Sequence, residues 1–228
     1  MKKKALVIAA HPDDEVLGCG GTIARLTQEG YEFTVAILGE GITSRFAQRE
    51  EANPELLRQL HARATEAGRI VGVCDVRLFK LPDNRFDTVP LLDIVKMLES
   101  LISELHPEIV FTQHGGDLNI DHVVAFRATL TATRPLSDSP VRQLYAYEVA
   151  SSTEWAFQYF APVFQPNAFF DITGFLDKKI SAIEIYESER RAFPHPRSPE
   201  ALAQQAGHWG SVVGVHAAEA FQLVRARY

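Results

Sequence analysis

The sequence predicts an α/β fold, in which a mostly parallel sheet lies between two layers of helices. Short apolar runs of strand length alternate with longer segments whose apolar residues recur at helical spacing. The first run, residues 5–10, is continuously apolar, as expected of a strand that is buried on both faces. The 228 residues suit one sizeable domain, and we expect residues 1–228 to form a single domain.

The predicted elements follow one another in a regular order along the chain. Pro54 suits the first turn of a helix, whereas Gly30 and Pro107 suit positions that follow a helix end. We expect residues 171–228 to form a helical C-terminal portion that packs on the same domain. We expect strands at residues 5–10, 31–38, 76–81, 108–112, 143–149 and 168–172. We expect helices at residues 16–28, 54–71, 91–105 and 121–133.

Three glycines lie in the first predicted helix, at Gly18, Gly20 and Gly21. Their spacing is not the G-x-G-x-x-G of a dinucleotide-binding loop, and His-Pro-Asp-Asp-Glu occupies the place of the phosphate-binding turn. Close packing of this helix on the sheet explains the glycines better.

Three loops of the predicted fold lie on one side of the sheet. Open α/β sheets bind ligands at the carboxyl ends of their strands, near the point where the strand order reverses. The loops that follow the first, second and fourth strands are residues 11–15, 39–54 and 113–122. This topology brings two segments that are far apart in the sequence into one site.

Composition and charge exclude several classes of function. A formal net charge of −6 without a basic stripe argues against a nucleic-acid partner. Cys19 and Cys74 are too few for a disulfide framework, and together with the lack of a signal peptide they predict a cytoplasmic protein. No apolar run approaches the roughly 20 residues that span a bilayer, so we expect no membrane span. The oligomeric state stays open, a homo-oligomer included.

A histidine and two aspartates directly follow the first predicted strand. His11 and Asp14 are three residues apart across a strand-to-helix turn, and His122 begins the helix after the fourth strand. A catalytic zinc needs three such ligands and an open position for water. Asp13 is not needed as a ligand, so it is placed to take a proton from the bound water, whose pKa zinc lowers to about 7.

The two aspartates also have a purely structural interpretation. Carboxylates at a helix start cap backbone N–H groups and interact favourably with the helix dipole. Capping does not explain His11, which lies between a buried strand and Pro12. The combination with Asp121-His122 at the same predicted sheet end favours a metal site.

Two motifs carry a specific resemblance to a known family. The segment AAHPDDEVLGCGGTIARL at residues 9–26 and DLNIDH at residues 117–122 resemble the PIG-L/LmbE family of zinc-dependent N-deacetylases. Weaker similarity covers nearly the whole chain, including PHPRSPEAL at residues 194–202 and AEAFQLVR at residues 218–225. The resemblance implies a Rossmann-like three-layer sandwich that removes the N-acetyl group from an amino sugar or glycoconjugate. It implies Zn²⁺ as the cofactor, although two histidines and an aspartate also accept iron, cobalt or nickel.

The resemblance also implies roles for individual residues. By position, His11, Asp14 and His122 match the zinc ligands of the family, and Asp13 matches its general base. Asp121 would then orient neighbouring imidazole or amide groups.

Asn119 departs from the pattern of the family. Several members carry a histidine three residues before the last ligand, where this chain has Asn119. An amide can donate a hydrogen bond to an oxyanion, but it cannot deliver a proton to a leaving amine as an imidazolium can. Asp13 would therefore serve first as the base and, once protonated, as the acid.

Four further residues are candidates for substrate contacts. His114 follows the fourth strand directly and either lines the pocket or bonds within its own loop. His195 belongs to a segment that resembles a substrate-contacting part of the family, with loop packing as the alternative. Arg45, in the long loop after the second strand, could meet a sugar hydroxyl or a phosphate. Arg63 could do the same, unless it only forms a salt bridge with a helical Glu such as Glu66.

We therefore expect a zinc-dependent hydrolase in which Asp13 activates the metal-bound water and an acetamide is cleaved to amine and acetate. Its expected partner is a small N-acetylated sugar or glycoconjugate. One alternative is an amidase of the same fold that acts on a larger acyl or thiol-conjugated sugar. The other is a sugar- or nucleotide-binding module without catalysis.

Overall fold

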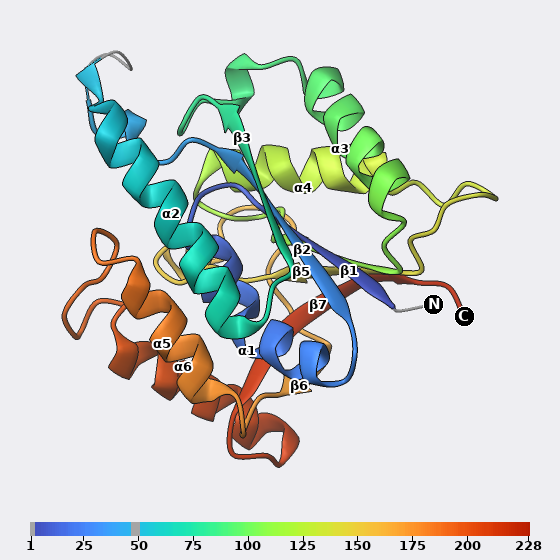
Figure 1. The fold of residues 1–228 in the computed structure, drawn as a ribbon. Helices are drawn as coiled ribbons and strands as arrows, with labels where there is room; N and C mark the ends of the chain where they lie inside the picture. The colour runs from blue at the N-terminus through green and yellow to red at the C-terminus, as the bar shows by residue number, and fades with distance from the viewer. Residues whose placement is uncertain (1–2, 47–50) are drawn as a thin grey trace.

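The core of the protein is a seven-stranded sheet with the strand order β3-β2-β1-β4-β5-β7-β6 (Figure 1). The computed structural model describes residues 3–46 and 51–228, without the side chain of Arg45. The first five strands are parallel, whereas β7 runs antiparallel to both of its neighbours. The strands are β1 (Lys4–Ala9), β2 (Glu32–Gly39), β3 (Asp75–Leu81), β4 (Ile109–Gln113), β5 (Gln143–Tyr147), β6 (Ala168–Asp171) and β7 (Ala218–Ala226).

Helices cover both faces of this sheet, so the predicted three-layer sandwich is confirmed (Figure 1). The apolar residues of β1 alternate between two cores, with Val7 in one and Ile8 in the other. Among the described residues, no helix is both long enough and apolar enough to cross a bilayer. One face carries α1 (Asp14–Gln28), α2 (Pro54–Val71), α5 (Leu176–Ile185) and α6 (Pro199–Val213), and the other carries α3 (Leu91–Leu105) and α4 (Ile120–Ala132).

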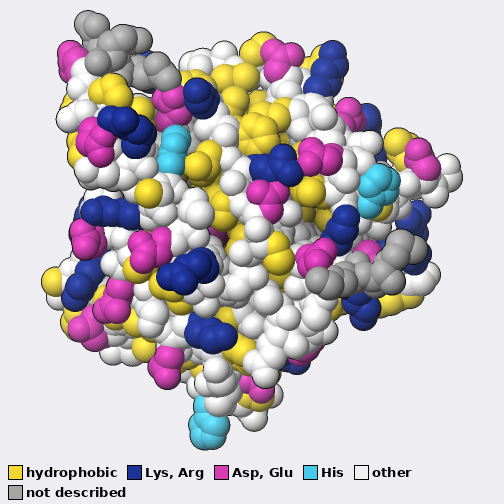
Figure 2. All heavy atoms as spheres, viewed as in Figure 1, with side chains coloured by type: hydrophobic (Ala, Val, Ile, Leu, Met, Phe, Trp, Pro, Cys, Tyr) yellow, Lys and Arg dark blue, Asp and Glu magenta, His cyan; other side chains and the backbone are white. Residues whose placement is uncertain are grey.

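The predicted helix ends agree closely with the structure. Pro54 is the first residue of α2, and the Asn53 side chain caps this helix by accepting a hydrogen bond from the Glu55 N–H. Gly30, predicted to follow a helix end, has a φ of 93°, which favours glycine. Acidic and basic side chains are interspersed on the face shown in Figure 2, and neither kind forms a continuous stripe there.

The prediction for the C-terminal portion was incomplete. Residues 171–228 contain α5 and α6, but they end in β7, which the sequence analysis did not predict. This strand lies between β5 and β6 and contains the buried Glu219, which interrupts the apolar pattern of a central strand. The Glu219 carboxylate accepts hydrogen bonds from the backbone N–H groups of Gly21 and Thr22, and it pairs with Lys179 at 2.6 Å.

The strand order reverses between β1 and β4, which are neighbours in the sheet. From β1 the chain winds outward through β2 to β3, and from β4 it continues to β5. The loops that follow β1 and β4 therefore open into the same crevice, where open α/β sheets bind their ligands. The predicted juxtaposition of residues 11–15 with residues 113–122 is confirmed.

The predicted close packing of α1 on the sheet is confirmed at Gly18. A Cβ atom at this position would lie 2.1 Å from Cδ2 of Tyr147. The Tyr147 ring is fully buried, and its hydroxyl donates a 2.8 Å hydrogen bond to the Ile8 carbonyl, so the ring has no room to move away.

We predict that Gly18→Ala lowers the free energy of unfolding by about 1–3 kcal/mol, the usual cost of overpacking a core. Gly207→Ala is the matched control, because Gly207 also lies inside a helix but has no atom within 4 Å of the added Cβ. The control should be stabilised by up to about 1 kcal/mol, since alanine favours helices over glycine. Urea denaturation measures both effects, and equal stability of the two variants would contradict the packing argument.

Candidate metal centre and active site

A small polar cavity of about 150 Å³ opens at the carboxyl ends of the parallel strands. Its walls come from the loops after β1, β2, β3 and β4, from α2, and from the segment between α5 and α6. The residues that line it are His11, Pro12, Asp13, Gly41, Ile42, Ser44, Leu60, Asp83, Asn84, Asn119, Glu189 and Arg197.

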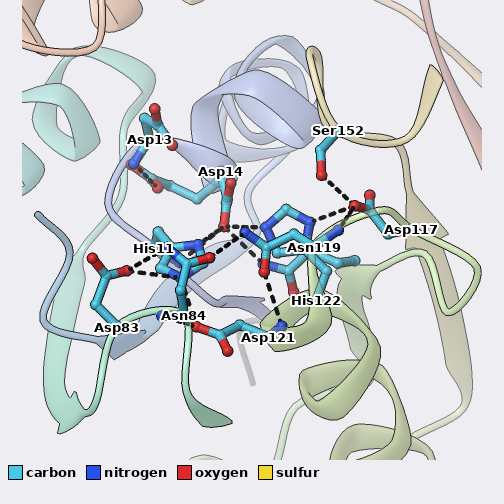
Figure 3. A network of polar contacts seen from close by, with 12 residues as sticks. His11, Asp13, Asp14, Asp83, Asn84, Asp117, Asn119, Asp121, His122 and Ser152 are labelled. Carbon is cyan, nitrogen blue, oxygen red and sulfur yellow. Dashed lines mark hydrogen bonds and ion pairs between the residues drawn. The ribbon is translucent and has the colours of Figure 1, made fainter. Parts of the chain in front are cut away.

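His11, which lines this cavity, comes together with Asp14 and His122 beside it (Figure 3). Each offers one ligand atom, and the three atoms lie within 4.8 Å of one another. Asp14 Oδ2 lies 3.5 Å from His11 Nδ1 and 3.3 Å from His122 Nε2. The three residues that the sequence predicts as metal ligands are therefore grouped as one cation would require.

The bonding of Asp14 fits a bound cation. Its Oδ2 atom accepts hydrogen bonds from the His11 N–H at 2.8 Å and from Gln113 Nε2 at 3.1 Å. Its Oδ1 atom is buried and has no hydrogen-bond partner among the described residues. Leaving a buried carboxylate oxygen without a donor is costly. Two imidazoles and one carboxylate form a donor set that suits zinc.

Asp121 orients the ring of His11. Its Oδ2 atom lies 2.9 Å from His11 Nε2, on the side of the ring that faces away from Asp14. The backbone N–H groups of Asn84 and Phe86 donate to Oδ2 and Oδ1 of Asp121, at 2.7 and 2.9 Å. His11, Asp83 and Asp121 could also group around a cation. The bonds that already saturate Asp121 favour the group that contains Asp14.

Asp117 makes an ion-pair contact with the second imidazole, that of His122. Its Oδ1 atom lies 3.2 Å from His122 Nδ1, so His122 Nε2 faces Asp14 (Figure 3). The hydroxyls of Ser152 and Thr153 and the Asn119 N–H all donate to the Asp117 carboxylate. A carboxylate behind a ligating histidine fixes both the orientation and the tautomer of the ring.

The charges of these groups stabilise protonated imidazoles. Burial opposes protonation of His122, but Asp14 and Asp117 raise its pKa to about 9. Burial also opposes protonation of His11, and its hydrogen bonds with Asp121 and Asp14 still raise its pKa well above the usual value. Burial would raise the pKa of Asp14, but the two histidines hold it well below its usual range.

Asp13 lies beside this group with its carboxylate at the cavity wall. It precedes α1 with a φ of 110°, a strained backbone conformation for any residue but glycine. Burial raises the pKa of Asp13 well above its usual range, and the charge of Arg197 opposes this shift. Nη1 of Arg197 lies 2.7 Å from Asp13 Oδ2.

Comparison with known proteins agrees with this geometry. Residues 6–133 match the family model described as PIG-L, GlcNAc-PI de-N-acetylase. The chain belongs to the PIG-L family. The matched region contains both histidine-bearing loops, and Arg197 lies beyond it.

Three relatives show how far the PIG-L similarity extends. The chain is 26% identical to a probable N-acetyl-alpha-D-glucosaminyl L-malate deacetylase 2 from Bacillus cereus, over 84% of this chain and 86% of the relative. It is 29% identical to a 4-oxalmesaconate hydratase from Pseudomonas putida, over 85% of this chain and 77% of the relative. A crystal structure of a conserved protein from Thermus thermophilus superposes with a TM-score of 0.75 at 27% identity, over 100% of this chain and 97% of that one.

The structure separates the remaining predicted site residues. Asn119 lines the cavity, where its Nδ2 donates to Asn84 Oδ1 and its Oδ1 accepts from the Asp121 N–H, capping α4. Arg63 instead pairs with Glu187 at 2.8 Å, next to a neighbouring cavity. The side chain of Arg45 lies outside the described part of the structure.

The two histidines predicted as substrate contacts do not line the cavity. His114 bonds to the Pro162 carbonyl, and His195 accepts a hydrogen bond from the Arg197 N–H and contacts the Trp155 ring. The substrate roles of His114, His195, Arg63 and Arg45 stay predictions.

Sequence reasoning missed four residues of this site: Asp83, Asn84, Asp117 and Arg197. Asp83 and Asn84 follow β3, and a turn-forming Pro-Asp-Asn sequence directly after a predicted strand was the available signal. Arg197 stands two residues after His195, in the segment that was already singled out. The further signal for Arg197 was that a buried aspartate needs a cationic partner.

We predict that binding of a divalent metal releases protons from this site. Near pH 7 the imidazoles of His11 and His122, the predicted ligands, are protonated in the metal-free protein, because their pKa values lie above the usual one, and a ligating imidazole must be neutral. The apparent affinity should therefore rise with pH between 7 and 9, about tenfold per pH unit for each imidazole that titrates.

Calorimetry of Zn²⁺ binding in buffers with different ionisation enthalpies counts the protons released. We expect between one and two protons per ion at pH 7. Asp121→Asn should lower that number, because it removes the carboxylate that supports the charge on His11. An affinity that does not change with pH would contradict the prediction.

Proposed function

We propose that this protein is a zinc-dependent N-deacetylase that hydrolyses the N-acetyl group of an amino sugar or glycoconjugate. The observation that carries the proposal is a buried carboxylate, that of Asp13, at the wall of a cavity formed beside the His11, Asp14 and His122 group. The PIG-L family match and the B. cereus relative, named as a deacetylase, support the same reaction. Water and an acetamide are consumed, and acetate and a primary ammonium ion are released.

His11, Asp14 and His122 would hold the metal. When bound there, such an ion would supply Lewis-acid chemistry, which would lower the pKa of a water molecule and polarise the acetamide carbonyl. The remaining chemistry is the transfer of one proton from water to the leaving nitrogen, and it falls to the side chains of the cavity.

Asp13 is the candidate for both halves of this proton transfer. Its carboxylate takes the proton from water as the general base. The same group, once protonated, delivers that proton to the amine nitrogen as the C–N bond breaks. Burial favours the protonated form between these steps, and the ion pair with Arg197 favours the ionised form in the resting enzyme.

Arg197 is a positioning residue in this mechanism. The Ser151 hydroxyl and the Ala150 carbonyl accept hydrogen bonds from its Nε, while its Nη1 contacts Asp13. These contacts fix the Asp13 carboxylate against the cavity. Asn119 cannot replace Asp13 as an acid, but its amide can donate a hydrogen bond to the substrate oxygen.

The cationic side chains of the cavity favour a neutral acetamide over an anionic substrate. Asp13, Asp83 and Glu189 line the cavity, and Arg197, which also lines it, already pairs with Asp13. The described lining contains no second arginine or lysine to pair with the carboxylates of an organic acid, as a hydratase of this family would require. We further propose that the substrate is a small sugar conjugate of the cytoplasm.

We predict that Asp13→Asn lowers kcat for acetate release by about 10²- to 10⁴-fold, the usual contribution of a general base. An enzyme-coupled acetate assay on N-acetylglucosamine conjugates measures the rate, and bound zinc should stay at one ion per chain. Asp93→Asn is the control, because Asp93 is exposed on α3 and lies far from Asp13 in the sequence. Undiminished turnover in Asp13→Asn would remove this residue from the mechanism.

We predict that Arg197→Ala lowers kcat by roughly 10- to 100-fold with little change in KM, because a misplaced catalytic group reacts slowly although substrate still binds. Arg197→Lys should recover part of the rate, since it keeps the charge but not the bonds to Ser151 and Ala150. Arg134→Ala removes an exposed arginine paired with Glu99 and should leave both constants unchanged. A rise in KM alone would instead make Arg197 a substrate contact.

A further inference from the structure

A second cavity, of about 420 Å³, lies beside the loops that follow β4 and β5. Its described lining residues are all different from those of the active-site cavity. One wall is aromatic and is formed mostly by the segment between β5 and β6, with one residue from α6. The aromatic residues are Phe157, Phe160, Phe164 and Trp209.

The polar groups of this second cavity are mainly hydrogen-bond acceptors. Glu148 and Glu154 supply two carboxylates, and Glu148 Oε1 accepts the Trp209 Nε1–H at 2.6 Å. His114 Nε2 lies 2.7 Å from the Pro162 carbonyl, which can only accept, so the ring proton is on Nε2 and Nδ1 carries a lone pair.

His114, which lines this cavity, has a hydrogen-bond acceptor that is unpaired within the described part of the chain. The residue is 1% exposed, and its Nδ1 is buried without a hydrogen-bond partner among the described residues. Burial lowers the pKa of His114, which keeps the ring neutral and the Nδ1 atom an acceptor. A ligand that donates hydrogen bonds would satisfy it.

The charged side chains that line the cavity are acidic. Among its described lining residues there is no lysine or arginine beside Glu148 and Glu154. Burial raises the pKa of Glu148 to about 7, the charge of Glu154 adds to this, and the hydrogen bond from Trp209 and the charge of Lys179 oppose it. An ammonium ion beside Glu148 would favour its ionised form. Carboxylates combined with aromatic faces are a common means of binding an ammonium ion.

We propose that this cavity binds a hydroxylated primary ammonium ion of the amino-sugar class. The ammonium group would meet the carboxylates, the hydroxyls would donate to His114 Nδ1, and the apolar face of the sugar ring would lie on the aromatic wall. Recognition of this ligand as the reaction product rests on the proposed deacetylase function. An N-acetylated sugar has no charge on that nitrogen, so it binds more weakly.

Tryptophan fluorescence tests the proposal directly. The chain has two tryptophans, and Trp155→Phe leaves Trp209, on the cavity wall, as the reporter. In this variant we expect a saturable change on titration with glucosamine. N-acetylglucosamine and glucose should bind at least tenfold more weakly. Equal responses to all three sugars would overturn the proposal.

Variants of the cavity provide the second test. In the Trp155→Phe background, Glu148→Gln should weaken glucosamine binding at least tenfold, whereas Glu99→Gln, at an exposed position on α3, should not. Phe160→Ala truncates a half-exposed wall residue and should also weaken binding, which covers the case in which Glu148→Gln does not fold. Unchanged affinity in a folded Glu148→Gln or Phe160→Ala variant would overturn the proposal.

Acetate release is measured separately for Glu148→Gln in the otherwise native chain. Its rate should stay within about twofold of the native rate, provided that product does not accumulate in the assay. Glucosamine binding needs no turnover, so it can succeed where the deacetylase assay fails. Loss of acetate release in the native protein overturns the proposed function, whereas loss of glucosamine binding overturns only the assignment of this cavity.

Discussion

The burial of several carboxylates at the ends of β1 and β4 is the constraint on which the surrounding structure depends. A buried carboxylate is unstable unless hydrogen bonds or opposite charges compensate the loss of water. Asp14 is compensated by two imidazoles, Asp121 by two backbone N–H groups and His11, and Asp13 by Arg197. These partners come from the segments after β1 and β3, from the first turn of α4 and from the segment before α6, so the charges tie distant parts of the chain together.

The same principle appears on the other side of α1. Lys179 and Glu219 are both buried, and their ion pair lies against the middle of this helix. Glu219 accepts from the N–H groups of Gly21 and Thr22, while Lys179 donates to the Leu17 carbonyl. Breaking one partner of such a pair leaves an uncompensated buried charge. The helix that begins with Asp14, a predicted metal ligand, is thus held by α5 and by the sheet, including β7.

Local sequence predicted those parts of the fold and site whose signals are local. The helix predicted over residues 91–105 has the bounds of α3, because its apolar residues recur at helical spacing and Pro107 follows. His11, Asp14 and His122 could be grouped because strand order fixes which loops meet. Arg197 could not be paired with Asp13, since 184 residues separate them and the sequence does not show which cation reaches a buried acid. β7 was missed because Glu219 looks like a surface residue until Lys179 is placed beside it.

The position of β7 has a consequence for how the polypeptide is made. This strand comes after both β5 and β6 in the chain, yet it pairs with β5 on one side and with β6 on the other. While the residues of β7 are still inside the ribosome, β6 has no neighbour in the sheet and one edge of β5 is exposed. The nascent chain therefore carries unpaired strand edges, a hazard for aggregation, until β7 has emerged.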